Sequence, residues 1–422
     1  MIEAGHERNF LSTLFSAAVR AADPESLIAA HLPDRPKGRV IVVGAGKAAS
    51  QMAAAFERVW KGPCEGVVVA RHGPVAETKF IRVLTAAHPV PDAQGLLGSK
   101  ALLDAVSGLT SDDLVVALIS GGGSALLPAP PDGFALEDEI MLNRALLHSG
   151  APISAMNCVR QHFSKIKGGR LAAAAFPARV VTLIVSDIPG DNPAFVASGP
   201  TVPSETNAED ARAILDDYRI DLPSSIREAI IHAHVPKPSD PLFRNNETHV
   251  IASARLSLEA AKQEAKNHGF EAVILSDAIE GEARDIGSMH AALTREVALN
   301  NAPFKKPIVL LSGGETTVSI AAGVQGRGGR NGEFLLSFAL AIQGLKGIHA
   351  LAADTDGIDG TESNAGAFAD GKTAETFRAA GLDGRALLLA HNSFEAFERI
   401  GALFSPGPTG TNVNDFRAIL IQ

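Results

Sequence analysis

Four short aliphatic runs in this chain end abruptly in glycine together with serine or an acid. These junctions cover residues 118–124, 184–191, 310–315 and 351–357. Each is followed by helix-like sequence, which is typical of a parallel strand that brings a polar loop to the carboxyl edge of a sheet, where open α/β folds bind ligands. Bare backbone amides and carboxylates suit phosphate and a divalent cation. We therefore expect phosphate chemistry at these strand ends.

A further junction, residues 44–49, reads Gly-Ala-Gly-Lys-Ala-Ala and matches the GxGxxA turn of dinucleotide-binding folds. A tight strand-to-helix connection would look the same. Nicotinamide binding is disfavoured because the next predicted strand is followed by Ala-Arg-His instead of an acid, and Ala48 stands where a Walker A loop needs Ser or Thr. We expect Gly46 and Lys47 to contact an anion; the alternative is a surface lysine at a helix start.

The loop after a predicted strand at 114–119 has three glycines between two serines. Its residues are Ser120, Gly121, Gly122, Gly123 and Ser124. Such a backbone can wrap closely around a carboxylate or phosphate, and the hydroxyls add hydrogen bonds. A flexible loop would have the same composition. The position directly after a buried strand favours an anion-binding cradle.

Asp187 and Asp191 flank a Pro-Gly turn after a predicted strand at 179–185. Two carboxylates at this spacing can bind magnesium through water, or one can act as general base toward a substrate hydroxyl. Asx-turn capping is the alternative, and it would leave one of the two without a chemical role.

Residues 154–167 show helical periodicity before that strand. Asn157, Arg160 and Lys167 lie beside the apolar face of this predicted helix. Cations at such a border either reach a ligand or extend along the apolar surface to water. Both interpretations stay open for Arg160 and Lys167.

The loop 326–332 reads Gly-Arg-Gly-Gly-Arg-Asn-Gly and precedes a predicted helix. Its candidate ligand-binding residues are Arg327, Gly328, Gly329, Arg330 and Asn331. Guanidinium groups, free amides and the helix dipole together suit phosphate oxygens, particularly the charge that develops in phosphoryl transfer. An exposed glycine-rich hairpin is the alternative.

Acids follow both strand-end junctions in the second half of the chain: Glu315 after one, and Asp354 and Asp356 after the other. The second loop superficially resembles a calcium-binding EF-hand, but Ala365 stands where the twelfth position requires Glu. A magnesium-associated acidic loop fits better. The later segment 409–412, Thr-Gly-Thr-Asn, alone predicts only a turn.

The elements that position these loops form two α/β series. The first has a helical stretch at 9–31 and strands at 40–43, 66–69, 83–86, 114–119 and 179–185. The alternation with helices predicts a parallel sheet. The second has strands at 249–252, 272–275, 308–311, 316–321 and 348–352, with helices at 256–267, 283–299 and 333–342. Prolines crowd the interval between the series, so we predict domains 1–243 and 244–422, with the last segment free to return to the active site.

Composition narrows the function classes. A length of 422 residues suggests two domains, and a net charge of −9 with interspersed cations argues against nucleic-acid binding. Cys64 and Cys158 alone cannot form a disulfide framework or a thiolate zinc site. No segment has the apolar run of a signal peptide or a membrane span. We expect a cytoplasmic protein without membrane or nucleic-acid partners.

Taken in order, these motifs resemble those of the class II glycerate kinase family. The segments that carry the resemblance are 44–47, 120–124, 157–160 with 166–169, 186–191, 198–201, 312–315, 326–331, 354–357 and 409–412. The second half of the chain is similar to the MOFRL domain. Family members have often been labelled hydroxypyruvate reductases because of their context in tartrate degradation.

The resemblance implies a Rossmann-like, doubly wound N-terminal domain and a smaller MOFRL-like α/β domain, with the active site in the cleft between them. It implies that D-glycerate is phosphorylated at its 2-hydroxyl by ATP with Mg²⁺, giving 2-phosphoglycerate. Lys47 and Arg327 match the catalytic basic residues that the family leads us to expect.

Within this hypothesis Asp187 is the expected acceptor of the hydroxyl proton. The candidate metal ligands are Asp187, Asp191, Glu315, Asp354 and Asp356. The expected contacts to substrate or nucleotide are Gly46, Ser120, Gly121, Gly122, Gly123, Ser124, Asn157, Arg160, Gly313, Gly314, Gly328, Gly329, Arg330, Asn331, Thr409, Gly410, Thr411 and Asn412. The competing hypothesis is an NAD(P)H-dependent hydroxypyruvate reductase built on the turn at 44–49. Either a monomer or a homodimer fits the sequence.

Overall fold

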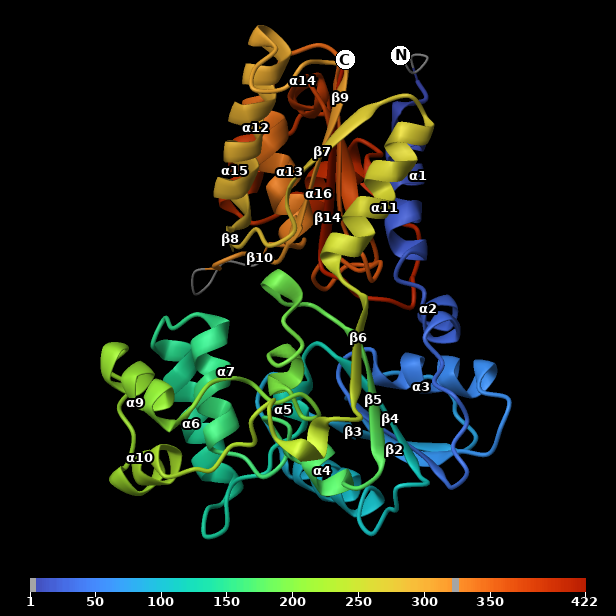
Figure 1. The fold of residues 1–422 in the computed structure, drawn as a ribbon. Helices are drawn as coiled ribbons and strands as arrows, with labels where there is room; N and C mark the ends of the chain where they lie inside the picture. The colour runs from blue at the N-terminus through green and yellow to red at the C-terminus, as the bar shows by residue number, and fades with distance from the viewer. Residues whose placement is uncertain (1–4, 321–325) are drawn as a thin grey trace. The chain divides into compact units, whose positions relative to one another are not determined.

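The computed structural model describes residues 5–320 and 326–422 (Figure 1). The chain divides into two compact units, one of residues 24–251 and one that combines residues up to 23 with 252–422. This division differs from the predicted domains in two places. Residues 5–23 join the C-terminal unit, and the boundary falls after residue 251 instead of 243.

The unit 24–251 is built on a six-stranded sheet in the order β3-β2-β1-β4-β5-β6. The strands are β1 (Val40–Ala45), β2 (Glu65–Arg71), β3 (Ile81–Ala86), β4 (Leu114–Ser120), β5 (Arg179–Val185) and β6 (Glu247–Ala252). The pairs β3–β2, β2–β1, β1–β4 and β4–β5 are all parallel. This strand order is that of the doubly wound Rossmann fold, and the strand order reverses between β1 and β4. The predicted fold class is confirmed.

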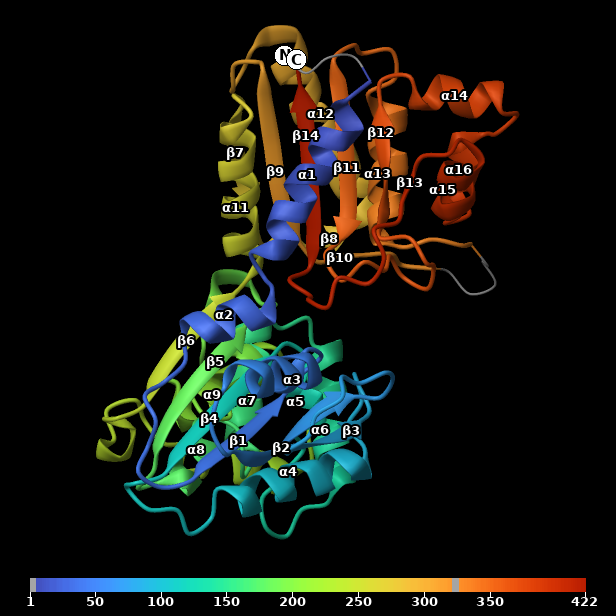
Figure 2. The same ribbon diagram turned by 90° about the vertical axis from the view of Figure 1, so that its right-hand side faces the viewer.

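Helices cover both faces of this sheet (Figure 2). On one face, alternate residues of β1, β2 and β4 pack against α4 (Ala93–Ala105) and α8 (Arg170–Ala175). On the other lies α3 (Ala49–Val59), whose Met52 and Phe56 are fully buried. Residues buried on both faces explain why the strands read as unbroken aliphatic runs.

Four further helices pack around a core of their own: α6 (Leu136–His148), α7 (Ile153–His162), α9 (Ala208–Asp217) and α10 (Ser224–Ile231). The predicted helix at 154–167 is too long, because α7 ends at His162 and the chain leaves helical geometry at Phe163. The remaining small elements of this unit are α2 (Pro24–Ala30), α5 (Gly123–Leu126) and three 3₁₀ turns at Pro189–Asp191, Val196–Ser198 and Pro241–Phe243.

The C-terminal unit contains a second six-stranded sheet in the order β13-β12-β11-β14-β9-β7. The strands are β7 (Glu271–Ser276), β9 (Ile308–Gly314), β11 (Ile348–Asp354), β12 (Gly366–Asp370), β13 (Leu403–Phe404) and β14 (Asp415–Ile421). β14 runs antiparallel between β9 and β11. β9 and β11 therefore point the same way, as predicted, but they are not neighbours, and the start of β14 lies between their carboxyl ends.

This sheet is also covered on both faces. One face packs against α12 (Ala283–Asn300) and α13 (Arg330–Ala341). The other packs against α1 (Glu7–Arg20) and α11 (Ala254–Asn267), through Phe10, Leu11, Leu14 and Phe15 of α1. Burial of this apolar face is the physical reason why the first helix belongs to the C-terminal unit and not, as predicted, to the N-terminal one.

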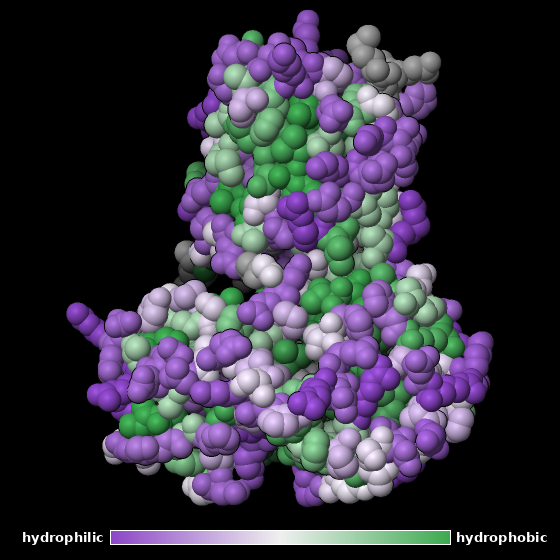
Figure 3. Space-filling view, in the orientation of Figure 1, coloured by the Kyte–Doolittle hydropathy of each residue, from purple (hydrophilic) through white to green (hydrophobic). Residues whose placement is uncertain are grey.

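The smaller elements of the C-terminal unit are β8 (Gly281–Glu282), β10 (Thr316–Thr317), α14 (Thr373–Ala379), α15 (Gly384–Leu389) and α16 (Ser393–Arg399). The predicted strand at 316–321 is reduced to the two residues of β10, and Ala321 lies outside the described residues. Hydrophilic and hydrophobic residues are interspersed on the face seen in Figure 3. Among residues 5–320 and 326–422, no helix has the length and apolar run that crossing a bilayer requires.

Candidate active site

The loops after β1 and β4 meet at the carboxyl edge of the first sheet. The Lys47 amide donates a hydrogen bond to the Gly121 carbonyl oxygen at 2.8 Å, and the Ala48 amide donates to Ser120 Oγ at 3.0 Å. Gly46 has a φ of 138°, and a Cβ there would lie 2.1 Å from Ser120 Oγ. The two loops are therefore packed together where the strand order reverses, which is where doubly wound folds bind ligands.

The Asp187 carboxylate lies directly over Gly121. A Cβ built on Gly121 would be 1.7 Å from Asp187 Oδ2, so only glycine leaves room for this carboxylate. Lys47 Nζ is 4.0 Å from Asp187 Oδ2, and the two side chains keep 27% and 17% of their surface exposed. The structure thus brings together three of the predicted residues: the cation Lys47, the carboxylate Asp187 and, beneath that carboxylate, Gly121. Both charged side chains keep part of their surface exposed to water and ligands.

His88 joins this group, although the sequence analysis did not select it. A Cβ on Gly122 would lie 3.0 Å from Lys47 Cγ and 3.2 Å from His88 Nε2, so both side chains border the same glycine. His88 follows β3, the edge strand, and no local motif marks it. Sequence alone gives no signal that it would reach the loop after β4.

The serine hydroxyls of the predicted cradle hold the loop itself. Ser120 Oγ accepts from the Ala48 amide, and Ser124 Oγ is 2.8 Å from Ser198 Oγ. Both hydroxyls thus have partners within the chain, and their contact with an anion stays a prediction. Backbone amides of the 120–124 loop and the ammonium group of Lys47 are further candidate donors.

Asn157 and Arg160 support this loop from behind. Asn157 Oδ1 accepts from Ser198 Oγ at 2.9 Å and from Arg160 at 3.2 Å, and Asn157 is buried. Burial lowers the pKa of Arg160 to about 10. Both residues thus lie in a buried chain of hydrogen bonds that ends at Ser124, and neither was predicted in that role.

The backbone of the segment that follows β5, up to Ser198, is strained. Asp191, Ala197 and Ser198 have φ values of 53°, 52° and 60°, a region that residues other than glycine seldom adopt. Such strain persists only where the surroundings enforce it, and it clusters at functional sites. Asp191 ends a 3₁₀ turn in this segment.

Lys167, left open by the sequence analysis, forms a buried ion pair. Its ammonium group is 2.6 Å from Glu139 Oε1, and the two side chains are 1% and 3% exposed. The other oxygen of Glu139 accepts from the Ala129 amide at 2.9 Å. This lysine is structural.

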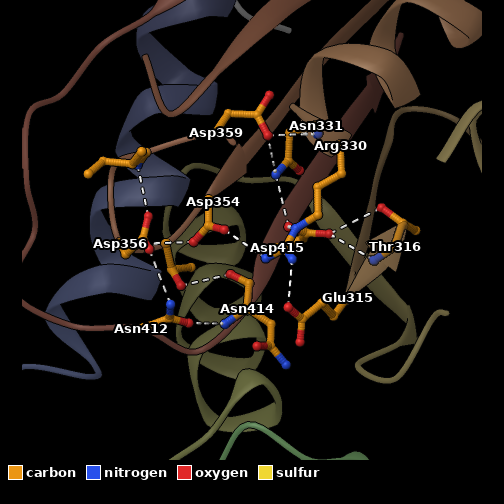
Figure 4. A network of polar contacts seen from close by, with 12 residues as sticks. Glu315, Thr316, Arg330, Asn331, Asp354, Asp356, Asp359, Asn412, Asn414 and Asp415 are labelled. Carbon is orange, nitrogen blue, oxygen red and sulfur yellow. Dashed lines mark hydrogen bonds and ion pairs between the residues drawn. The ribbon is translucent and has the colours of Figure 1, made fainter. Parts of the chain in front are cut away.

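A second polar cluster lies at the carboxyl edge of the other sheet (Figure 4). The Arg330 guanidinium contacts three carboxylates: Glu315 at 2.6 Å, Asp354 at 2.7 Å and Asp415 at 2.7 Å. Three of the predicted residues therefore meet in one place: Glu315 from the loop after β9, Arg330 from the start of α13 and Asp354 from the end of β11. Asp415, the fourth member, was not predicted.

Asp415 accepts hydrogen bonds from several elements at once. Its Oδ1 accepts from Arg330 and, at 2.9 Å, from Asn331 Nδ2, while its Oδ2 accepts from the Thr316 amide at 3.3 Å and from the buried Arg417. Asp415 is the first residue of β14, and Asp354 is its partner in the strand register. The only local signal was the run of polar residues before the largely apolar stretch 416–421, which includes Arg417.

Carboxylates outnumber cations in this cluster. The acids are Glu315, Asp354, Asp356, Asp359 and Asp415, and the cations are Arg330 and Arg417. Burial, and then repulsion from Asp356 and Asp415, raises the pKa of Asp354 well above its usual value. Burial alone would lower the pKa of Arg330, but the surrounding carboxylates raise it. Arg330 is therefore held as a cation by its neighbours.

The segment 409–412 packs on the acidic loop after β11. Thr409 Oγ1 donates to the Thr355 carbonyl oxygen at 2.5 Å, and Asn412 Nδ2 donates to Asp356 Oδ2 at 3.2 Å. These bonds bring together two predicted segments that are distant in sequence, 409–412 and the acidic loop 354–356. Gly313 and Gly314 pack against the chain instead: a Cβ on Gly314 would be 2.2 Å from the Ile279 amide.

Arg327 differs from Arg330 in its surroundings. Its guanidinium is 2.7 Å from Glu362 and lies 4.4 Å from the centre of the Phe394 ring, with 59% of the side chain exposed. The hydrogen bond to Glu362 raises its pKa. Its backbone is fixed on both sides, since its amide donates to Asn392 Oδ1 at 3.2 Å and its carbonyl accepts from the Phe394 amide at 2.9 Å.

Two of the amides at the start of α13 have acceptors within the chain. The Asn331 and Gly332 amides donate to the carboxylate of Asp359 at 3.0 and 2.8 Å. Gly326 and Gly328 are needed for packing, because a Cβ on either would lie within 2.3 Å of the segment 390–393. Three amides of the loop 326–332, those of Arg327, Asn331 and Gly332, thus donate within the chain. The predicted contacts of this loop with a ligand stay a prediction.

Within residues 5–320 and 326–422, no three acids, histidines or cysteines are grouped so that they could hold a metal ion as they stand. The five proposed ligands Asp187, Asp191, Glu315, Asp354 and Asp356 therefore stay predictions. The excess of hard carboxylate oxygens in the second cluster nevertheless fits a divalent cation, which would relieve the repulsion that raises the pKa of Asp354.

Comparison with known proteins assigns the family. Residues 10–231 match the domain of unknown function DUF4147, and residues 308–415 match the MOFRL family. The D-glycerate 2-kinase of Thermotoga maritima is 40% identical over 94% of this chain and 94% of that protein. The glycerate 2-kinase of Pyrococcus horikoshii is 41% identical over 95% of this chain and 94% of its own length.

An Agrobacterium vitis protein with the provisional name hydroxypyruvate reductase is 49% identical over 98% of this chain and 94% of its own. Among solved structures, the Thermotoga maritima glycerate kinase matches with a TM-score of 0.87 at 38% identity, covering 98% of this chain and 99% of that one. The predicted resemblance is confirmed: the chain belongs to the glycerate 2-kinase family and carries its DUF4147 and MOFRL domains.

Proposed function

We propose that this protein is a glycerate 2-kinase that transfers the γ-phosphoryl group of ATP to the 2-hydroxyl of D-glycerate, giving 2-phosphoglycerate and ADP. The observation that carries the proposal is the Lys47–Asp187 pair over Gly121, at the point where the strand order of the first sheet reverses. A cation beside a carboxylate suits an acceptor that has both a carboxylate and a hydroxyl. Membership of a family with named glycerate 2-kinases supports it.

In this proposal Lys47 neutralises negative charge on the substrate. Asp187, whose oxygen lies 4.0 Å from the ammonium, accepts the proton of the 2-hydroxyl as the oxygen–phosphorus bond forms and the bond to ADP breaks. Gly121 and Gly122 leave the space in which these side chains lie. Positioning and charge neutralisation supply most of the catalysis in phosphoryl transfer.

The Arg330 cluster is the proposed partner for the nucleotide phosphates. Arg330 is a fully charged guanidinium held at the carboxyl edge of the second sheet, and Glu315 at its rim is 44% exposed and able to exchange for a phosphate oxygen. Arg327 is proposed to reach the transferred group after leaving Glu362. Some of Glu315, Asp354 and Asp356 would hold magnesium, which would supply positive charge to neutralise the nucleotide phosphates.

The sequence predicts that both clusters act on one pair of substrates in a cleft between the units, and this stays a prediction. A cytoplasmic location, where ATP is abundant, completes the proposal.

The competing hypothesis is a hydroxypyruvate reductase, the name that the Agrobacterium vitis relative bears. A nicotinamide cofactor would need close approach to the 44–49 turn. Gly46 instead makes room for Ser120, and the Ala48 amide at the start of α3 is already bonded to that serine. The turn is therefore engaged by its own chain, which favours the kinase.

The test compares two reactions of one preparation. We expect ADP release with D-glycerate and Mg-ATP, and no oxidation of NADH or NADPH with hydroxypyruvate. Glycerate-dependent ADP release should disappear in Lys47→Ala. The opposite pattern, nicotinamide oxidation without ADP release, would establish the reductase.

A further inference from the structure

The first turn of α13 is capped by a residue from a distant loop. A helix start leaves its first amides without partners in the helix, and Gly329 at the cap position has no side chain to supply one. Asp359, from the loop after β11, accepts from the Asn331 amide at 3.0 Å and from the Gly332 amide at 2.8 Å. A carboxylate at a helix start is also favoured by the helix dipole.

The surrounding chain is shaped to hold this carboxylate. A Cβ on Gly329 would lie 2.2 Å from Asp359 Oδ1, and Asp359 is 1% exposed. The Asp359 amide itself donates to the Asn364 carbonyl oxygen at 2.7 Å, which fixes its own backbone. The position that an anion would take at the start of α13 is therefore filled by a protein carboxylate.

The helix turn that Asp359 holds begins with Arg330. The side chain of Asn331, the next residue, donates to Asp415 Oδ1 at 2.9 Å, the same oxygen that Arg330 contacts at 2.7 Å (Figure 4). Asp359 thus fixes the backbone of this turn, and Asp415 fixes its side chains. Asp359 holds the backbone from which Arg330 extends, and Asp415, together with Glu315 and Asp354, holds its guanidinium.

We propose that Asp359 is a positioning residue, which aligns Arg330 for the nucleotide phosphates by capping α13 from another loop. The inference rests on the proposed kinase function, because it assigns Arg330 to the nucleotide. Asp359 does not touch substrate in this account. Its loss should therefore affect the nucleotide and leave D-glycerate binding, at the other sheet, unchanged.

The test variant is Asp359→Asn, which keeps the shape and removes the charge. The control is Asp383→Asn, because Asp383 also accepts from two amides at a helix start, those of Arg385 and Ala386 at 2.9 and 3.1 Å, but caps its own helix α15. In Asp359→Asn we expect the KM for ATP to rise and kcat to fall, so that kcat/KM for ATP is lower by about 10- to 100-fold. This is the size of loss seen when a residue that orients a metal ligand is replaced. The KM for D-glycerate should stay within about twofold, and Asp383→Asn should match the wild type.

Amide hydrogen exchange gives a readout that does not depend on activity. The Asn331 and Gly332 amides should be protected in the wild type and exchange faster in Asp359→Asn, while other amides of α13 keep their rates. Unprotected amides in the wild type would overturn the cap. Wild-type kinetics in Asp359→Asn, or equal losses for both substrates, would overturn the positioning role.

The proposed function can fail separately. If the wild type shows no glycerate kinase activity, the proposed kinase function is wrong. Titration with ATP then still tests the positioning role of Asp359, because Asp359→Asn should bind ATP about tenfold more weakly than the wild type. Equal affinities would contradict it.

Discussion

Adding one methyl group at Gly121 should disable the proposed general base without unfolding the protein. The new Cβ would lie 1.7 Å from Asp187 Oδ2 and 1.9 Å from its Cγ, so the carboxylate must turn away. The atoms displaced are the far end of a side chain, and the φ of Gly121 lies outside the left-handed region. Because alanine also restricts the unfolded chain, we expect the free energy of unfolding to change by less than about 1 kcal/mol.

The expected cost is catalytic. A positioned general base contributes about 10²- to 10⁴-fold, which corresponds to about 3 to 5 kcal/mol in the activation free energy. Gly121→Ala should therefore lower kcat by at least about 100-fold, measured as glycerate-dependent ADP release. Gly62→Ala is the control in the same unit, since a Cβ there has its nearest heavy atom 3.2 Å away at Trp60 Nε1.

A double variant makes the reasoning refutable. If Gly121→Ala acts by displacing Asp187, then adding it to Asp187→Asn should cause little further loss, because both changes remove the same group. Additive losses, or a Gly121→Ala enzyme with wild-type kcat, would show that the position of Asp187 over Gly121 does not matter for catalysis.

Three further outcomes follow from the described contacts. Lys47→Ala should lower kcat/KM for D-glycerate by at least about 100-fold, whereas Lys47→Arg should recover part of it, as measured by coupled ADP assay. Lys167→Met should reduce the free energy of unfolding by about 3 to 5 kcal/mol, because it leaves Glu139 buried without its partner, while Lys100→Met at an exposed pair should change it by less than about 1 kcal/mol in urea titrations. Burial lowers the pKa of His290 to about 4, and its Nε2 lies 3.0 Å from Ser312 Oγ with Arg417 nearby. The unfolded chain therefore binds more protons below pH ~6.5, and stability should fall by about 2 kcal/mol between pH 7 and 5, a loss that His290→Gln should remove.

The sequence predicts those parts of the site that lie in loops directly after predicted strands. The loops around Lys47, Gly121 and Asp187 each follow a buried parallel strand, and parallel strands necessarily bring their carboxyl ends to one edge. Glu315 and Asp354 were found for the same reason, whereas Arg330 was found from the Gly-Arg loop before α13. The common position of the two acids could be expected from the direction of β9 and β11.

The residues that the sequence analysis missed depend on contacts between distant segments. Asp415 enters the second cluster because β14 inserts antiparallel between β9 and β11, which no local pattern indicates. Asp359 caps a helix that begins 29 residues earlier in the chain. His88 arrives from the edge strand of the first sheet.

Three glycines show a limit of what sequence can tell about a close approach to the backbone. The predicted ligand contacts of Gly46, Gly121 and Gly329 stay predictions, and each glycine makes room for a side chain of the protein: Ser120, Asp187 and Asp359 respectively. A glycine-rich loop in sequence shows that something approaches the backbone closely. It does not show whether that neighbour is a ligand or the chain itself.

The central claim is that Lys47 and Asp187 serve phosphoryl transfer to the 2-hydroxyl of D-glycerate. The most direct measurement is carbon-13 and phosphorus-31 NMR of the product formed from D-glycerate and Mg-ATP by the wild type and by Lys47→Ala. We predict 2-phosphoglycerate with the wild type and no product with the variant over the same time. Phosphate on the 3-hydroxyl, or equal product formation by Lys47→Ala, would contradict the account.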